Sequence, residues 1–149
     1  MSFGARERQS GMDAARAIIE ANRYITLATA DAKGVPWASP VWFAPDGDDL
    51  LWLSRPDTRH SRNLAVRPRL AIVIFDSSAH PDDAAALYLS ATASETDTGI
   101  EVYSARSLAQ GLRAFTTDDL TTFRLYRARV HERWVLGPGD RRLPVGLSA

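Results

Sequence analysis

The segment Arg55–Arg69 concentrates side chains that could bind an anion. It holds five arginines and one histidine against a single acidic residue, although the whole chain carries no net charge. Thr58 is placed to cap a short helix that begins at Arg59. On that helix Arg59 and Arg62 would share one face, and paired guanidinium groups suit the oxygens of a phosphate. Cations, hydroxyls and free N–H groups at a helix start therefore predict a phosphate site.

Two other interpretations of this segment stay open. Its arginines could form a solvated helix face, or they could contact nucleic acid. Nucleic-acid binding needs a wide basic surface, and eighteen basic residues balanced by eighteen acidic ones do not favour it. We therefore expect no nucleic-acid partner.

The histidines and tryptophans give weaker signals. His60 could donate to a phosphate, but His60, His80 and His131 show no metal-ligand spacing, so the sequence predicts no metal site. Trp42 and Trp52 fall in neighbouring expected strands. Aromatic side chains in strands more often belong to a barrel core or a dimer interface than to a cofactor contact.

The bulk composition is typical of one globular domain spanning residues 1–149. Apolar residues make up 45% of the chain and charged residues 24%, and there is no cysteine, which excludes disulfides and thiolate chemistry. The first residues lack the apolar core of a signal peptide, and no apolar run approaches the length of about 20 residues that spans a bilayer. The expected location is cytoplasmic, with no membrane partner.

The positions of turn residues and apolar periodicity predict the elements that must hold the basic segment. We expect a mobile polar leader at residues 1–9, a helix at 10–22 with Ser10 as its cap, and a loop-like tail at 137–149. Strands are expected at residues 24–30, 36–44, 50–54, 70–75, 86–93 and 123–136. Further helical segments are expected from Arg59, at 98–110 with a capping residue and Glu101 at the third helical position, and at 117–121. Six turn-linked strands with two or three inserted helices favour a small antiparallel barrel over a βαβ sheet.

Four segments carry a resemblance to a known family: residues 39–43 (SPVWF), 51–54 (LWLS), 58–64 (TRHSRNL) and 67–71 (RPRLA). Together with the order of elements between about Arg23 and Trp134, they resemble the pyridoxamine 5′-phosphate oxidase-like split-barrel flavoproteins. The resemblance implies a mainly β, Greek-key split barrel that forms a homodimer. It also implies FMN, or in one branch the deazaflavin F420, in grooves at the subunit interface, and some members bind haem instead.

Matched position by position, the resemblance also implies which residues contact the cofactor. Ser54 matches a strand-end hydroxyl on the flavin phosphate, and Arg59 with His60 matches an Arg-Lys pair there. The phosphate set implied is Ser54, Arg59, His60, Ser61 and Arg62. The second strand would hydrogen-bond the ring edge through its backbone, and the ring contacts implied are Ser39, Val41 and Trp42.

Two departures separate this chain from the vitamin B6 oxidase itself. The oxidase carries an Arg and a Lys on the second strand, where alignment places Ala38 and Phe43. Its Arg-rich C-terminal segment is matched only weakly by residues 141–144. The resulting hypothesis is an FMN-dependent oxidoreductase with a small-molecule redox substrate and no nominated catalytic side chain. The alternatives are an F420-dependent reductase of the same fold, and a flavin or haem carrier or sensor without turnover.

Overall fold

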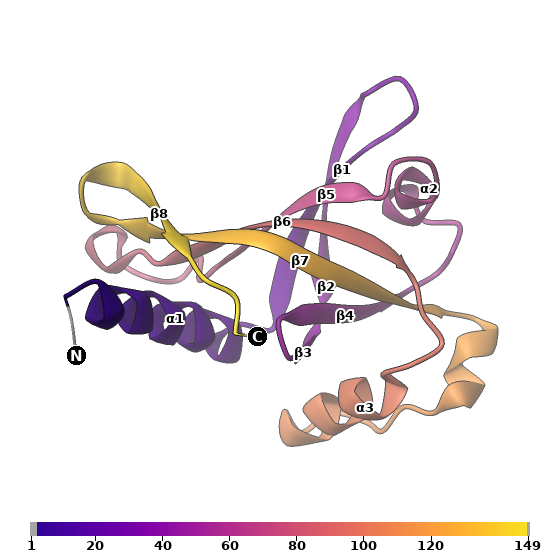
Figure 1. Cartoon of the computed structure of the whole chain (residues 1–149). Helices are drawn as coiled ribbons and strands as arrows, with labels where there is room; N and C mark the ends of the chain where they lie inside the picture. Colours follow the sequence, from indigo (N-terminus) through magenta and orange to yellow (C-terminus); the bar gives the residue numbers. More distant parts are fainter. Residues whose placement is uncertain (1–2, 149) are drawn as a thin grey trace.

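A computed structural model describes residues 3–148, and one antiparallel sheet forms its centre (Figure 1). The strands are β1 (Tyr24–Ala30), β2 (Pro36–Trp42), β3 (Ala44–Asp46), β4 (Asp49–Ser54), β5 (Arg69–Phe75), β6 (Ala86–Glu95), β7 (Arg124–Gly137) and β8 (Arg141–Val145). The helices are α1 (Phe3–Ala21), α2 (Arg59–Val66) and α3 (Ile100–Ala109), with 3₁₀ turns η1 (Pro81–Asp83), η2 (Thr117–Thr121) and η3 (Pro138–Asp140). The strand order is β2-β1-β5-β6-β7-β4-β3, and β8 pairs with β7.

Alternating burial along the strands builds the core. In β5, Leu70, Ile72 and Ile74 point inward while the residues between them stay exposed or half-exposed. This period of two is what a strand with one packed face requires. Trp52 is wholly buried and its ring stacks on Tyr126 with the centroids 5.9 Å apart. The predicted antiparallel split-barrel class is confirmed.

The second predicted strand is divided in two, which is one reason why six expected strands become eight. β2 ends at Trp42 and β3 begins at Ala44, because the wholly buried Phe43 turns the chain inward and its N–H donates to the Arg23 carbonyl at 3.3 Å. A turn through Gly47, with a φ of 61° that glycine adopts without strain, then joins β3 to β4.

The expectation of a mobile leader at residues 1–9 is wrong for the part that the structure describes, because α1 already begins at Phe3 and Ser10 is not its cap. Residues 1 and 2 lie outside the described part. The added turns are rich in Ala, Arg, Glu and Gln, which favour helix. Tertiary contact comes from the later turns, where Ala15, Ile18 and Ile19 are buried in the core. In Figure 1 the helix runs beneath the β8 end of the sheet.

The expectation of a loop-like tail at residues 137–149 is wrong for residues 141–145, and residue 149 lies outside the described part. Residues Arg141–Val145 form β8, which pairs with the last part of β7 in the register Trp134↔Pro144. The buried Arg133 donates through Nε and Nη2 to the Gly146 carbonyl, at 3.0 and 2.7 Å, and so anchors the segment. Two arginines and Pro144 hid this strand, since proline is confined to edge strands and charged side chains are common there.

The two helix-start predictions have different outcomes. Thr58 does cap α2, because its Oγ1 accepts from the Ser61 N–H at 3.3 Å. The helix predicted at 98–110 begins at Ile100, and its N-cap is Gly99 without a side-chain hydrogen bond. The Thr98 hydroxyl faces Thr96 instead, at 3.2 Å between the Oγ1 atoms. The predicted side-chain cap of α3 is therefore wrong.

Candidate functional site

The candidate site begins where β4 ends and α2 starts. Ser54 closes β4, a short loop with Pro56 follows, and Thr58 starts the helix. The N–H groups in the first turn of a helix have no intrahelical acceptor, so this end is suited to an anion. Thr58 satisfies one of these groups, that of Ser61. Only a short loop therefore separates Ser54, the last residue of the strand, from the capping residue Thr58.

Ser54 and His60 form a buried pair at this junction. The Ser54 Oγ lies 2.8 Å from the His60 Nε2, and both residues are less than 10% exposed. The Thr58 Oγ1 lies 3.3 Å from the same nitrogen. Burial lowers the pKa of His60 below its ordinary value, which favours the neutral imidazole. His60 therefore helps to fix the strand end to the helix start, and a bound phosphate would have to raise its pKa before it could donate as a cation.

Arg59 and Arg62 are the exposed cations of the site. The guanidinium carbon of Arg59 lies 4.3 Å from the ring centroid of Trp37 on β2, which connects the helix start to the edge strand. Neither arginine has a carboxylate within 4.0 Å among residues 3–148. Both charges are therefore available to an anionic ligand.

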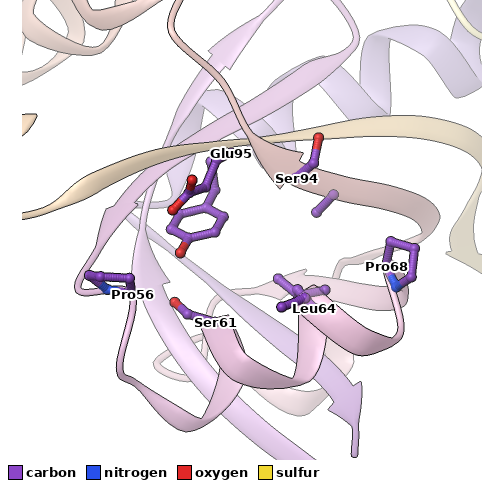
Figure 2. A pocket seen from close by; sticks show the side chains of 9 residues that line it. Pro56, Ser61, Leu64, Pro68, Ser94 and Glu95 are labelled. Atoms are coloured by element: carbon purple, nitrogen blue, oxygen red, sulfur yellow. The ribbon is translucent and has the colours of Figure 1, made fainter. Parts of the chain in front are cut away.

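Ser61 points away from the two arginines. Its Oγ accepts from the Thr58 hydroxyl at 2.7 Å. Ser61 also lines a cavity together with Tyr126, whose pKa is raised mainly by burial (Figure 2). Its side chain therefore faces this cavity, and it is connected to His60 only through the Thr58 hydroxyl.

The three predicted ring-contact residues lie on β2, which is the edge of the sheet. Ser39 is half-buried, Val41 is buried in the core, and the Trp42 indole N–H donates to the Gln110 Oε1 at 2.9 Å. The Trp42 ring also meets Tyr103 edge to face, with the centroids 4.9 Å apart. The side chains of Val41 and Trp42 are therefore occupied, so a ligand along β2 would meet mainly backbone.

Arg67 has a structural task. Its Nε donates to the Asp31 carbonyl at 2.7 Å and its Nη2 to the Ala32 carbonyl at 3.0 Å, so it holds the β1–β2 turn against the end of α2. Asn63 adds a second link, because its Nδ2 donates to the Thr29 Oγ1 at 3.0 Å. The turn also contains Asp31. The Val35 N–H, followed by the Lys33 N–H and the charges of Arg59 and Arg67, lowers the pKa of Asp31.

Sequence reasoning missed several of these partners. Trp37 was not connected to Arg59, Gln110 was not connected to Trp42, and Thr29 gave no sign of its bond to Asn63. Each pair joins segments far apart in the chain, so no local spacing signals it. Trp37 alone carried a usable hint, since an aromatic residue on an exposed edge strand needs some partner.

A sizeable cavity lies away from Arg59 and Arg62, neither of which lines it. It has a volume of about 550 Å³ and lies between α2 and the adjoining ends of β6 and β7 (Figure 2). Among residues 3–148, no cluster of three or more His, Cys, Asp or Glu side chains could hold a metal ion. In the same part of the chain, no helix has both the length and the apolar character needed to cross a bilayer.

Comparison with known proteins gives the family. The sequence profile described as pyridoxamine 5′-phosphate oxidase matches residues 12–135. The chain belongs to this family. A search among curated proteins finds no match.

Solved structures with the same fold include proteins named for haem. A heme binding protein from Mycobacterium smegmatis shares 28% identity over 89% of this chain and 56% of its own, with a TM-score of 0.67. The chain thus spans a little over half the length of that protein. HutZ, the heme storage protein of Vibrio cholerae, shares 23% identity over 80% of this chain and 90% of its own, with a TM-score of 0.65. ChuZ of Campylobacter jejuni shares 16% identity over 98% of this chain and 64% of its own, with a TM-score of 0.71. The last two likenesses show the fold alone.

Proposed function

We propose that this protein is an FMN-binding oxidoreductase that acts as a homodimer on a small-molecule substrate, and that it is not the vitamin B6 oxidase. The observation that carries the proposal is the position of Arg59. It opens a capped helix beside the Ser54–His60 pair and reaches across to Trp37 on the edge strand. One residue therefore links a phosphate-binding helix start with a strand that could lie under a planar ring.

The phosphate half of the site fits a dianion. Arg59 and Arg62 are exposed without carboxylate partners, and the first turn of α2 adds backbone N–H groups and a favourable dipole. Ser54 and His60 supply a hydroxyl and an imidazole where β4 ends and α2 begins. A phosphate there would exchange the weak contact of Arg59 with Trp37 for a charge-assisted one.

The edge strand β2, the second part of the proposed site, suits the polar edge of a flat ring system. β2 ends the strand order, so one side of its backbone faces no neighbouring strand within the described residues. Pro36 and Pro40 sit in it, as prolines do in edge strands. The free N–H and C=O groups of such an edge can pair with the heteroatoms of a ring. FMN, when bound, would carry the electrons, and this chain's residues would orient it and exclude water.

The homodimer is supported by an apolar surface on the outer face of the sheet. Paired residues of neighbouring strands share a face, and the pairs Thr26↔Val73 and Val73↔Tyr88 place this face over β1, β5 and β6. Tyr24 is 60% exposed and Phe75 is 50% exposed at one end of it. The apolar members of the face are Tyr24, Ala28, Ala71, Val73, Phe75, Tyr88 and Trp134. A surface of this kind on a sheet favours burial against a second copy.

The purified protein tests the proposal through its absorption spectrum and titration with FMN and with F420. Saturable binding of FMN, with reduction of the bound flavin by a nicotinamide donor, supports an oxidoreductase. Preference for F420 would move the assignment to a deazaflavin-dependent reductase of the same fold. No saturable binding of either compound overturns it, and turnover of pyridoxamine 5′-phosphate would contradict the exclusion of the vitamin B6 enzyme.

A second candidate, haem binding without redox turnover, is supported by the 28% identity with the Mycobacterium smegmatis protein. Haem iron takes an axial ligand such as His, Met or Tyr. His131 is the exposed histidine on β7, and its Nε2 lies 2.7 Å from the Thr92 Oγ1 on the outer face of the sheet. A Soret band upon hemin titration that His131→Ala abolishes would select this function, whereas an unchanged band would exclude His131 as the ligand.

A further inference from the structure

We propose that the cavity between α2 and the β6–β7 edge is a second ligand site, specific for a small apolar molecule that carries one amine. This site is separate from the cationic helix start and does not depend on the proposed cofactor. It lies on the opposite side of α2 from Trp37 and holds none of the exposed arginines.

The walls of the cavity are apolar. Two prolines mark its ends, Pro56 before α2 and Pro68 after it, and Leu64 faces the strands from the helix between them (Figure 2). Ala65 and Ala93 have short side chains, so they leave space rather than fill it. A volume of about 550 Å³ lies within the range of pockets that enclose small molecules.

One charge faces this space. Glu95 is the only carboxylate among the nine lining residues, which include no Arg, Lys or His. Its side chain is 54% exposed and its nearest cation, the Arg124 Nε, lies 3.9 Å from Oε1, a loose surface pair of small energy. A carboxylate with free lone pairs beside apolar walls suits a ligand that combines a cationic group with an apolar body.

A phenol and two hydroxyls lie beside that carboxylate. Tyr126 lines the cavity together with Glu95 and Ser61, and the Thr58 hydroxyl donates to the Ser61 Oγ at 2.7 Å. The ring of Tyr126 is held by its stacking on the buried Trp52. Figure 2 shows Glu95 and Ser61 near the Pro56 end of the cavity, with Leu64 and Pro68 towards its other end. An ammonium group could donate to Glu95 at this position while its apolar body packs toward Leu64 and Pro68.

Phenethylamine is a suitable probe, because it joins one ammonium group to a compact ring. In a titration of ¹⁵N-labelled full-length protein followed by NMR, we expect saturable shifts at Ala65, Ala93 and Glu95. Glu95→Gln keeps the size of the side chain but removes the charge, and it should weaken binding about tenfold or more. Ala65→Phe places a ring in the cavity from an exposed helix position and should abolish the shifts. Glu101→Gln, on the exposed face of α3, is the matched control and should bind as the wild type does.

3-Phenylpropionate carries the same ring with the opposite charge and decides the chemical class. Equal or tighter binding of this anion overturns the proposal. So does binding of phenethylamine that is unchanged in both Glu95→Gln and Ala65→Phe, or the absence of any saturable shift. Because these measurements contain no flavin or haem, their failure leaves the proposed function untouched, and failure of the proposed function leaves them unaffected.

Discussion

The guanidinium of Arg59 lies over the indole of Trp37, with its central carbon 4.3 Å from the ring centroid. The two residues come from the first turn of α2 and from the edge strand β2, so the contact joins these two elements directly. The contact is exposed, and such cation–π pairs contribute about 0.5–1 kcal/mol. A phosphate could therefore displace it at little cost, while the bonds of Asn63 to Thr29 and of Arg67 to Asp31 keep the helix region against β1 and the β1–β2 turn.

Arg59→Ala should weaken FMN binding more than Arg67→Ala does. Removing Arg59 takes away an exposed guanidinium at the helix start, which corresponds to about 10- to 100-fold in affinity for a charge-assisted contact. Arg67 is occupied by the carbonyls of Asp31 and Ala32, so its loss should instead loosen the β1–β2 turn. Quenching of flavin fluorescence measures the first effect and thermal unfolding measures the second. Equal retention of flavin by both variants would contradict the assignment.

The pH dependence of stability should report the buried His60. Its pKa is lowered in the folded state by burial, so below the unfolded value of about 6.5 the unfolded chain binds a proton that the folded chain does not. The free energy of unfolding should therefore fall as the pH decreases from about 6.5 towards the folded pKa, by at most about 1.4 kcal/mol per pH unit. Urea unfolding at several pH values measures this slope.

His60→Gln should remove that slope, and His131→Gln, at an exposed position on β7, should keep it. A slope that persists in His60→Gln would show that another group takes up the proton. Asp31, Asp76 and Asp119 have lowered pKa values, each through hydrogen bonds. Their contribution is present above about pH 4 and is lost only as the pH falls below that, whereas the slope from His60 begins already near pH 6.5.

Gly99→Ala should destabilise the protein by about 1–3 kcal/mol. Gly99 has a φ of 109°, and a Cβ there would lie 2.9 Å from the Arg127 Nη2 and 3.1 Å from the Leu51 Cδ1. Both the positive φ and the lack of free space therefore disfavour a side chain at Gly99. Gly34→Ala meets only the unfavourable φ of 83°, and Gly146→Ala meets neither obstacle. Chemical denaturation should show the largest loss of stability for Gly99→Ala, a smaller one for Gly34→Ala and the smallest for Gly146→Ala. An equal loss of stability in all three variants would refute the steric explanation.

Val73→Asp should convert a dimer into a monomer. Val73 lies in the centre of the apolar outer face, between Thr26 and Tyr88, where a charge would have to be buried against the second copy. Sedimentation should show the change, with circular dichroism confirming that the sheet is intact. Leu108→Asp is the control, since Leu108 is 56% exposed on α3. A wild-type chain that is monomeric at all concentrations would exclude the proposed interface, and with it a cofactor groove shared by two subunits.

Local sequence was sufficient where the controlling interaction is local. The period-two burial of Leu70, Ile72 and Ile74 follows from the pleat of a strand, and the cap by Thr58 depends on residues only three apart. Turn residues delimited most of the strands for the same reason. The fold class could therefore be predicted from patterns that a short stretch of chain contains.

Tertiary structure decided the rest, because those outcomes depend on segments that meet only after folding. Pairing with β7 makes a strand of Arg141–Val145, and contact with Trp37 fixes the direction of Arg59. The predicted phosphate set held both Ser61 and Arg59, which are two residues apart on one helix. The rotation of about 100° per residue in an α-helix turns one to the cavity beside Tyr126 and the other to the edge strand. Which side chains share a site was thus set by the docking of α2 on the sheet, an arrangement that no local pattern encodes.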